Sequence, residues 1–149
     1  MRTQRGFAVL ELMLALAIMG LLAVVALPSL QRYMAQRDLQ QTARQLGTDL
    51  RLTQQYAVTQ NEPFRLAYVA ASAQYSLLRV SDGTLVKQVG VPSTLSISST
   101  FTSDRVDFTA TGAPVQSGAF CVSDGTAILM VDVQPGTGRA QIAEVPTCP

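Results

Sequence analysis

Few residues in this chain have side chains whose setting suggests chemistry, and the clearest is one carboxylate in an apolar segment. Glu11 stands near the start of a run that has no charged or strongly polar side chain from Leu12 to Leu27. A carboxylate in a membrane-spanning helix costs roughly 2.5–3.5 kcal/mol at the helix centre, and less near an end. Such a group needs a partner of opposite charge within a few ångströms. Glu11 is therefore the first candidate functional residue.

The other polar groups do not form a catalytic arrangement. The chain has no histidine, which is the commonest general base near neutral pH. Ser81-Asp82-Gly83 and Ser123-Asp124-Gly125 are typical of turns, because neither has the strand-to-helix context of a nucleophile elbow. Asp104 and Asp107 flank Arg105 and could touch a cation, but two carboxylates make a weak metal signal. We predict that the protein is not an enzyme and has no metal site or cofactor.

Cys121 and Cys148 are the two cysteines, and both lie late in the chain. If this part of the chain is exported, they can pair, and a disulfide closing a loop of this length stabilises a fold by roughly 3–4 kcal/mol. The bond would pin the tail to the strand that holds Cys121. In a reducing compartment they would be two buried thiols. The net charge of +1 gives no global electrostatic argument for a nucleic-acid partner.

The apolar run belongs to a long predicted helix. Residues 7–33 form its first half, which is long enough to cross a membrane because about 20 apolar residues suffice. Pro28 lacks an N–H donor and is expected to kink or loosen the helix there. In residues 34–60 the pattern becomes amphipathic, with one apolar stripe of Leu39, Ala43, Leu46, Leu50 and Ala57. Asn61-Glu62-Pro63 predicts the end of the helix.

Three arginines recur at seven-residue intervals on the second half of this helix. Arg37, Arg44 and Arg51 are thereby expected to line one exposed face. Such a face is usually solvated. The alternative interpretation is a strip that contacts adjacent subunits or lipid headgroups.

Residues 61–149 have the composition of short strands separated by turns. We predict the strands Phe64–Val69, Gln74–Val80, Thr84–Val89, Leu95–Ser99, Arg105–Thr111, Ala119–Val122, Ala127–Val133 and Arg139–Val145. The predicted fold class is α+β, with one long N-terminal helix packed on a small antiparallel β domain.

The N-terminus could be an ordinary secretory signal peptide, but its apolar run is too long and no clean cleavage site follows it. Gly6-Phe7, followed by Glu11 and the apolar run, resembles the processing site of type IV pilins and pseudopilins. The resemblance implies that a prepilin peptidase cuts between Gly6 and Phe7, removes residues 1–6 and methylates the new N-terminus of Phe7. It also implies the pilin fold, and that Glu11 meets the N-terminal ammonium of a neighbouring subunit. The basic leader places the N-terminal side in the cytoplasm and residues 61–149 in the periplasm or outside.

Residues 50–66 look like the general secretion H or fimbrial T type of minor pilin, with a late arginine, a helix break and then a strand. The pair Gly138-Arg139 is similar to one in the last hairpin of that type. Some of its members bind DNA through a Gly-Arg-x-Arg element, but here Ala140 and Gln141 follow, so the second arginine is absent. One arginine makes a weak phosphate site. We therefore predict that the pair closes a hairpin, and keep Arg139 as a possible DNA contact.

Together these features predict a minor pilin or pseudopilin subunit with an assembly or initiation role in a type IV pilus or a type II secretion pseudopilus. Its expected partners are prepilin peptidase, other pilin or pseudopilin subunits and the inner membrane, which its helix spans once. Two alternatives are a DNA-binding minor pilin for DNA uptake and a bitopic membrane protein that is never processed.

Overall fold

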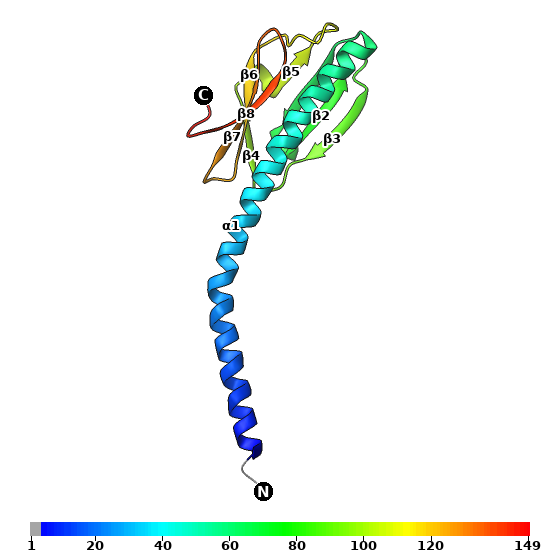
Figure 1. Cartoon of the computed structure of the whole chain (residues 1–149). Helices are drawn as coiled ribbons and strands as arrows, with labels where there is room; N and C mark the ends of the chain where they lie inside the picture. Colours follow the sequence, from blue (N-terminus) through cyan, green and yellow to red (C-terminus); the bar gives the residue numbers. More distant parts are fainter. Residues whose placement is uncertain (1–3) are drawn as a thin grey trace. The chain divides into compact units, whose positions relative to one another are not determined.

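The computed structural model describes residues 4–149, and within helix α1 (Gln4–Gln60) the side chains of residues 4–8, 25–29 and 31–32 lie outside the description (Figure 1). The chain divides into two compact units, Met1–Gln36 and Arg37–Pro149. The first three residues of the predicted leader are outside the described residues. So is the side chain of Pro28, where a kink was predicted.

Helix α1 ends at Gln60, where the sequence predicted a stop. Asn61 adopts a left-handed conformation with φ of 53°, and the N–H of Glu62 donates to the carbonyl of Ala57 at 3.2 Å. Asparagine tolerates this conformation, and Pro63 has no N–H with which to continue the helix. The chain therefore turns directly into the first strand.

Within residues 4–149, eight strands form two four-stranded antiparallel sheets. The first sheet has the order β3-β2-β1-β5, with β1 (Phe64–Val69), β2 (Gln74–Arg79), β3 (Leu85–Gly90) and β5 (Arg105–Phe108). The second has the order β4-β6-β7-β8, with β4 (Ser96–Ser99), β6 (Gly118–Ser123), β7 (Ile128–Val133) and β8 (Ala140–Val145). Two short 3-10 helices, Ala70–Ser72 and Thr102–Asp104, connect strands. The α+β fold with antiparallel sheets is thus confirmed.

Strand β5 is shorter than the predicted Arg105–Thr111. It ends at Phe108 because a tight turn follows, in which the N–H of Gly112 donates to the carbonyl of Thr109 at 2.8 Å. Gly112 has φ of +82°, a conformation that glycine adopts without steric cost. The turn brings Pro114 beside Phe108 in an isolated bridge.

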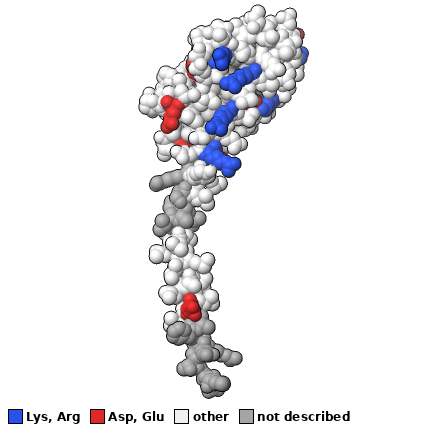
Figure 2. Space-filling model, in the orientation of Figure 1, with Lys and Arg blue, Asp and Glu red and all other residues white. Residues whose placement is uncertain are grey.

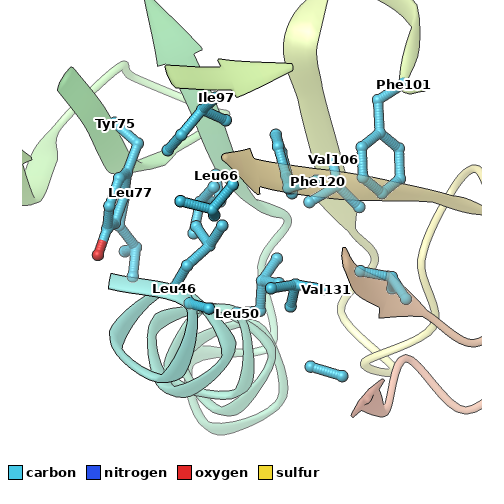
Figure 3. Packing of buried hydrophobic residues seen from close by; sticks show 14 of the residues in the cluster. Leu46, Leu50, Leu66, Tyr75, Leu77, Ile97, Phe101, Val106, Phe120 and Val131 are labelled. Carbon is cyan, nitrogen blue, oxygen red and sulfur yellow. The ribbon is translucent and has the colours of Figure 1, made fainter. Parts of the chain in front are cut away.

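The apolar stripe of the helix is buried as predicted, with no residue of the stripe more than 2% exposed. It packs in the unit Arg37–Pro149 against residues from both sheets. In Figure 3, Leu46 and Leu50 point from the helix toward Leu66, while Tyr75 and Leu77 lie to one side and Phe120 and Val131 to the other. One core thus joins the second part of α1 to the two sheets. Burying a side chain of this size contributes roughly 1.5–3 kcal/mol.

Candidate assembly and interaction sites

The N-terminal unit presents an apolar surface around the whole helix. Every described residue from Val9 to Val24 is exposed, and the large hydrophobic side chains among them are between 51% and 71% exposed. Glu11 is exposed among them. An apolar surface of this extent marks a site that another molecule covers. Across the residues searched, no helical stretch combines the length and the hydropathy of a membrane-spanning helix. For the predicted processing residues Gly6 and Phe7, the structure describes only the helical backbone.

Cys121 and Cys148 form the predicted disulfide, with an S–S distance of 2.00 Å. Cys121 lies on β6 and is 1% exposed. The bond holds the C-terminal tail against the second sheet, where Pro149 lines a shallow depression with Met130 and Asp132 of β7. The tail is therefore attached to the strand that the sequence suggested.

The pair Gly138-Arg139 closes the hairpin between β7 and β8, as predicted. The N–H of Gly138 donates to the carbonyl of Gln134 at 2.9 Å, and Gly138 has φ of +67°. Arg139 is exposed, whereas Gly138 is buried. The sequence predicted the turn but not what the buried glycine packs against.

Gln54 of α1 fixes this hairpin to the helix. Its side-chain Nε2 donates to the carbonyls of Gly112 and Thr137, both at 2.7 Å. One amide thus holds both the connection from β5 to β6, which links the two sheets, and the β7–β8 hairpin of the second sheet. Nothing in the sequence distinguishes Gln54 from the other glutamines of the helix, so this contact could not have been found from the pattern.

A buried carboxylate joins the helix to the first sheet. Asp49 is 1% exposed, and its oxygens accept from Lys87 Nζ at 2.6 Å, Tyr75 OH at 2.7 Å and Gln45 Nε2 at 3.1 Å. Lys87 lies on the edge strand β3 and Tyr75 on β2. A buried charge is tolerated only when it is paired and hydrogen-bonded, and Asp49 satisfies both conditions. The sequence feature that could have indicated this buried carboxylate is the position of Asp49, three residues after Leu46 and beside the apolar stripe of the helix.

The two carboxylates considered for a cation are engaged elsewhere. Asp107 forms a bidentate pair with Arg65, its neighbour across the β1–β5 ladder, at 2.6 and 2.7 Å. Asp104 accepts from the hydroxyl of Ser99 at 2.6 Å. The hydrogen bond with Asp107 raises the pKa of Arg65. Each carboxylate thus has its own partner, Asp107 across the β1–β5 ladder and Asp104 in the nearby Ser99.

Comparison with known proteins decides the family. The family described as type II transport protein GspH matches residues 42–138. The chain belongs to the GspH family. The family described as the prokaryotic N-terminal methylation motif matches residues 1–27. The resemblance inferred from the residues around Glu11 and from residues 50–66 is confirmed.

Two curated proteins are similar in sequence to this GspH-family chain. The competence protein ComGD of Bacillus subtilis (strain 168) is 28% identical over 139 residues, which are 93% of each chain. The fimbrial protein EcpB of Eikenella corrodens is 42% identical over 48 residues, 32% of this chain and 30% of that protein.

Solved structures share the fold of this GspH-family chain. The type IV minor pilin FimU of Pseudomonas aeruginosa (strain PAO1) has a TM-score of 0.57 at 19% identity, covering 78% of this chain and 96% of that one. The minor pseudopilin EpsH from the type 2 secretion system of Vibrio cholerae has a TM-score of 0.61 at 11% identity, covering 74% and 99%. At these identities the likeness shows the pilin fold.

Tyr75, which is bonded to Asp49, is expected to make this GspH-family chain less stable as the pH rises into the alkaline range. Burial, with a smaller effect of the hydrogen bond to Asp49, raises the pKa of Tyr75 far above its ordinary value of 10.0. Above that value the phenol of the unfolded chain loses its proton while the folded phenol keeps it. The unfolded state then binds fewer protons, so the free energy of unfolding falls as the pH rises, by up to about 1.4 kcal/mol per pH unit.

We therefore expect Tyr75→Phe to flatten the dependence of stability on pH above about pH 10. The measurement is urea denaturation of both proteins at a series of alkaline pH values. The matched control is Tyr68→Phe, at the residue that pairs with Tyr75 across the β1–β2 ladder. This variant keeps Tyr75 and is expected to show the same dependence of stability on pH as the wild type. An unchanged slope in Tyr75→Phe would contradict the prediction.

Proposed function

We propose that this chain is a minor pilin or pseudopilin subunit that is processed by prepilin peptidase and built into a type IV pilus or a type II secretion pseudopilus, with a role in assembly or initiation. The observation that carries the proposal is the exposed apolar helix surface from Val9 to Val24 with Glu11 as its one charged residue. A surface like this is stable only when lipid or other apolar helices cover it. The protein acts as a structural subunit and needs no catalytic group.

The proposal assigns a role to each segment. Residues 1–6 are removed as a leader, and residues 7–33 anchor the subunit in the inner membrane and later enter the filament core. Residues 34–60 carry the amphipathic half of the helix, and residues 61–149 form a β domain in the periplasm or on the filament. The disulfide between Cys121 and Cys148 supports this placement, because such bonds persist in oxidising compartments.

Glu11 is the residue whose removal tests the assembly role. In the assembled filament its carboxylate pairs with the N-terminal ammonium of a neighbouring subunit. Removing one partner of a pair in an apolar setting leaves the other charge uncompensated, which costs roughly 3–5 kcal/mol. We expect Glu11→Ala to be cleaved normally but to enter filaments less efficiently, by a factor of roughly one hundred to a few thousand.

The measurement is the amount of the subunit in sheared filaments, beside the mass of its mature N-terminus. Glu11→Asp keeps the charge and is the matched control, with a smaller expected loss. Normal incorporation of Glu11→Ala into filaments would show that Glu11 does not pair with the N-terminal ammonium during assembly. A mature protein that still begins at Met1 would instead support the alternative of an unprocessed bitopic membrane protein.

A further inference from the structure

Strand β8 is an edge strand of the second sheet, and within residues 4–149 its only neighbour in that sheet is β7. The N–H of Gln134 donates to the carbonyl of Arg139 at 3.0 Å, so these two residues form a hydrogen-bonded pair of the β7–β8 ladder. Bonded and non-bonded pairs alternate along an antiparallel ladder. The backbone groups that point away from β7, to the free side of β8, are therefore those of Ala140, Ile142 and Glu144.

The other edge strands have features that hinder the addition of a further strand. Strand β4 is only four residues long. Strand β3 has an irregular register with β2 and directs Lys87 inward to Asp49, at 2.6 Å. The free side of β5 is covered, because the N–H of Val115 donates to the carbonyl of Asp107 at 2.8 Å. Short length, bulges, inward charges and a covering loop are the usual means by which proteins prevent edge pairing.

Strand β8 has none of these features in the described part of the chain. All six of its residues, Ala140–Val145, pair with β7 in an unbroken register. Residues 141–144 are exposed, and Ile142 is 43% exposed. The strand carries a single charge, that of Glu144. A regular and exposed edge strand is a template to which another strand can be added.

Helix α1 places two arginines beside the free side of β8. A Cβ at Gly47 would lie 3.5 Å from Ile142 Cδ1, so this part of the helix lies against Ile142. Arg44 and Arg51 are exposed, three residues before and four residues after Gly47, and are therefore its neighbours on the helix surface. The guanidinium of Arg51 reaches the edge itself, where it donates to the carbonyl of Ala140 at 3.1 Å. Figure 2 shows Lys and Arg side chains in a column on one face of this unit.

These charges determine which side chains an added strand should carry. Residues directly opposite each other in a ladder have their side chains on the same face of the sheet. A side chain opposite Ile142 would therefore lie next to α1, near Arg44 and Arg51, where a carboxylate is favoured. A side chain opposite the exposed Glu144 would meet a carboxylate, where a cation is favoured.

We propose that β8 binds an extended strand of a partner protein, with an acidic residue opposite Ile142 and a basic residue opposite Glu144. In an antiparallel strand, the more stable arrangement per residue, the basic residue precedes the acidic one by two positions. The carbonyl of Ala140 is already bonded to Arg51, so the backbone groups of Ile142 and Glu144 make the main bonds to the partner. Main-chain bonds of this kind supply affinity, and the side chains select the partner.

A second copy of this chain fits the free side of β8 less well. Residues 37–60 of α1 run antiparallel to β8, since Arg51 lies at the start of the strand and Gly47 lies beside Ile142. Antiparallel pairing of two β8 strands would therefore make these helical segments of the two copies run in opposite directions. Two subunits anchored in one membrane through the preceding part of α1 cannot pair in this way. This step rests on the proposed function.

The test measures binding of a fluorescent peptide of about ten residues to the full chain in detergent micelles. The peptide alternates Thr and Val, with one Lys two positions before one Asp. The control peptide has the same composition, with the Lys and the Asp exchanged. We expect the first peptide to bind roughly tenfold more tightly, because the exchange turns two attractive cross-strand pairs into repulsive ones.

Variants of the protein locate the binding site. Ile142→Pro removes an N–H on the free side of β8 and no bond to β7, and should weaken binding of the first peptide by roughly tenfold. Ile142→Val keeps this N–H and is the matched control. Arg44→Gln should reduce the difference between the two peptides, whereas Arg105→Gln, at an exposed arginine on β5, should leave it unchanged. Thermal melting of each variant verifies that it is folded.

Four results would overturn the proposal. The first three are no binding of either peptide, equal binding of both, and binding that Ile142→Pro does not weaken. The fourth is the formation of dimers by the wild type that Ile142→Pro abolishes, which would assign the free side of β8 to a second copy. Peptide binding depends on neither Glu11 nor processing, so the proposed assembly role stands or falls separately.

Discussion

Gly138→Ala is expected to lower the free energy of unfolding of the unit Arg37–Pro149 by about 2–5 kcal/mol. Part of the loss is the backbone, since φ of +67° costs a residue with a Cβ about 1–2 kcal/mol. The rest is overpacking, which costs about 1–3 kcal/mol. A Cβ at this position would lie 2.7 Å from Gln54 Nε2, 3.0 Å from the carbonyl oxygen of Gly112 and 3.1 Å from the ring of Phe108. Because the oxygen belongs to the backbone, it cannot move aside cheaply.

Gly136→Ala in the same hairpin separates these two causes. Gly136 has φ of +79°, but a Cβ there would meet nothing within 4 Å. Urea denaturation of the two variants should therefore show a loss of about 1–2 kcal/mol for Gly136→Ala and a clearly larger loss for Gly138→Ala. Equal losses would mean that the hairpin moves away from Gln54 without cost, contrary to the two hydrogen bonds that Gln54 makes to Gly112 and Thr137.

Loss of the disulfide is the second large effect. Cys148→Ser is expected to lower the free energy of unfolding by about 3–4 kcal/mol, because the bond closes a loop of 27 residues and restricts the unfolded chain. Cys121 stays buried in this variant, so the core on β6 is not altered. The measurement is urea denaturation in the absence of a reducing agent.

The reduced wild-type protein is the matched comparison for Cys148→Ser. A dithiol removes the same cross-link without a substitution, and the two proteins should therefore have the same stability. Hydrogen exchange should quicken first in the C-terminal tail and in β6 and β7, against which the tail lies. A variant as stable as the oxidised wild type would show that the tail is held by its other contacts.

The local elements were predictable because their signals are periodic along the chain. The stripe from Leu39 to Ala57 predicted which side of the helix is buried, and Asn61 with Pro63 predicted where the helix ends. Alternating apolar residues and turn glycines predicted eight strands with nearly the observed bounds. Each of these features depends on neighbours within a few residues, which the sequence lists directly.

The pairing of strands that are not consecutive in the chain depended on the tertiary structure. Strand β5 pairs with β1, and β4 pairs with β6 across the intervening β5. The sequence signals for hairpins connect only consecutive strands. The order within each sheet is decided by how the apolar faces of both sheets meet the stripe of the helix, which is a property of the packed core.

Some candidate sites could be predicted from the sequence, and others were recognised only in the tertiary structure. The sequence by itself predicts Gly6 and Phe7 as processing residues and Glu11 as an assembly residue, because this prediction depends only on their fixed offsets before an apolar run. Only the fold brought Lys87 and Tyr75 to Asp49, and the β5–β6 connection and the β7–β8 hairpin to Gln54. It also placed Arg51 beside the start of β8, where its guanidinium donates to the carbonyl of Ala140, 89 positions further along the chain. A polar side chain acquires a partner only when packing removes it from water and fixes the distance, so no pattern in the chain records which partner it will be.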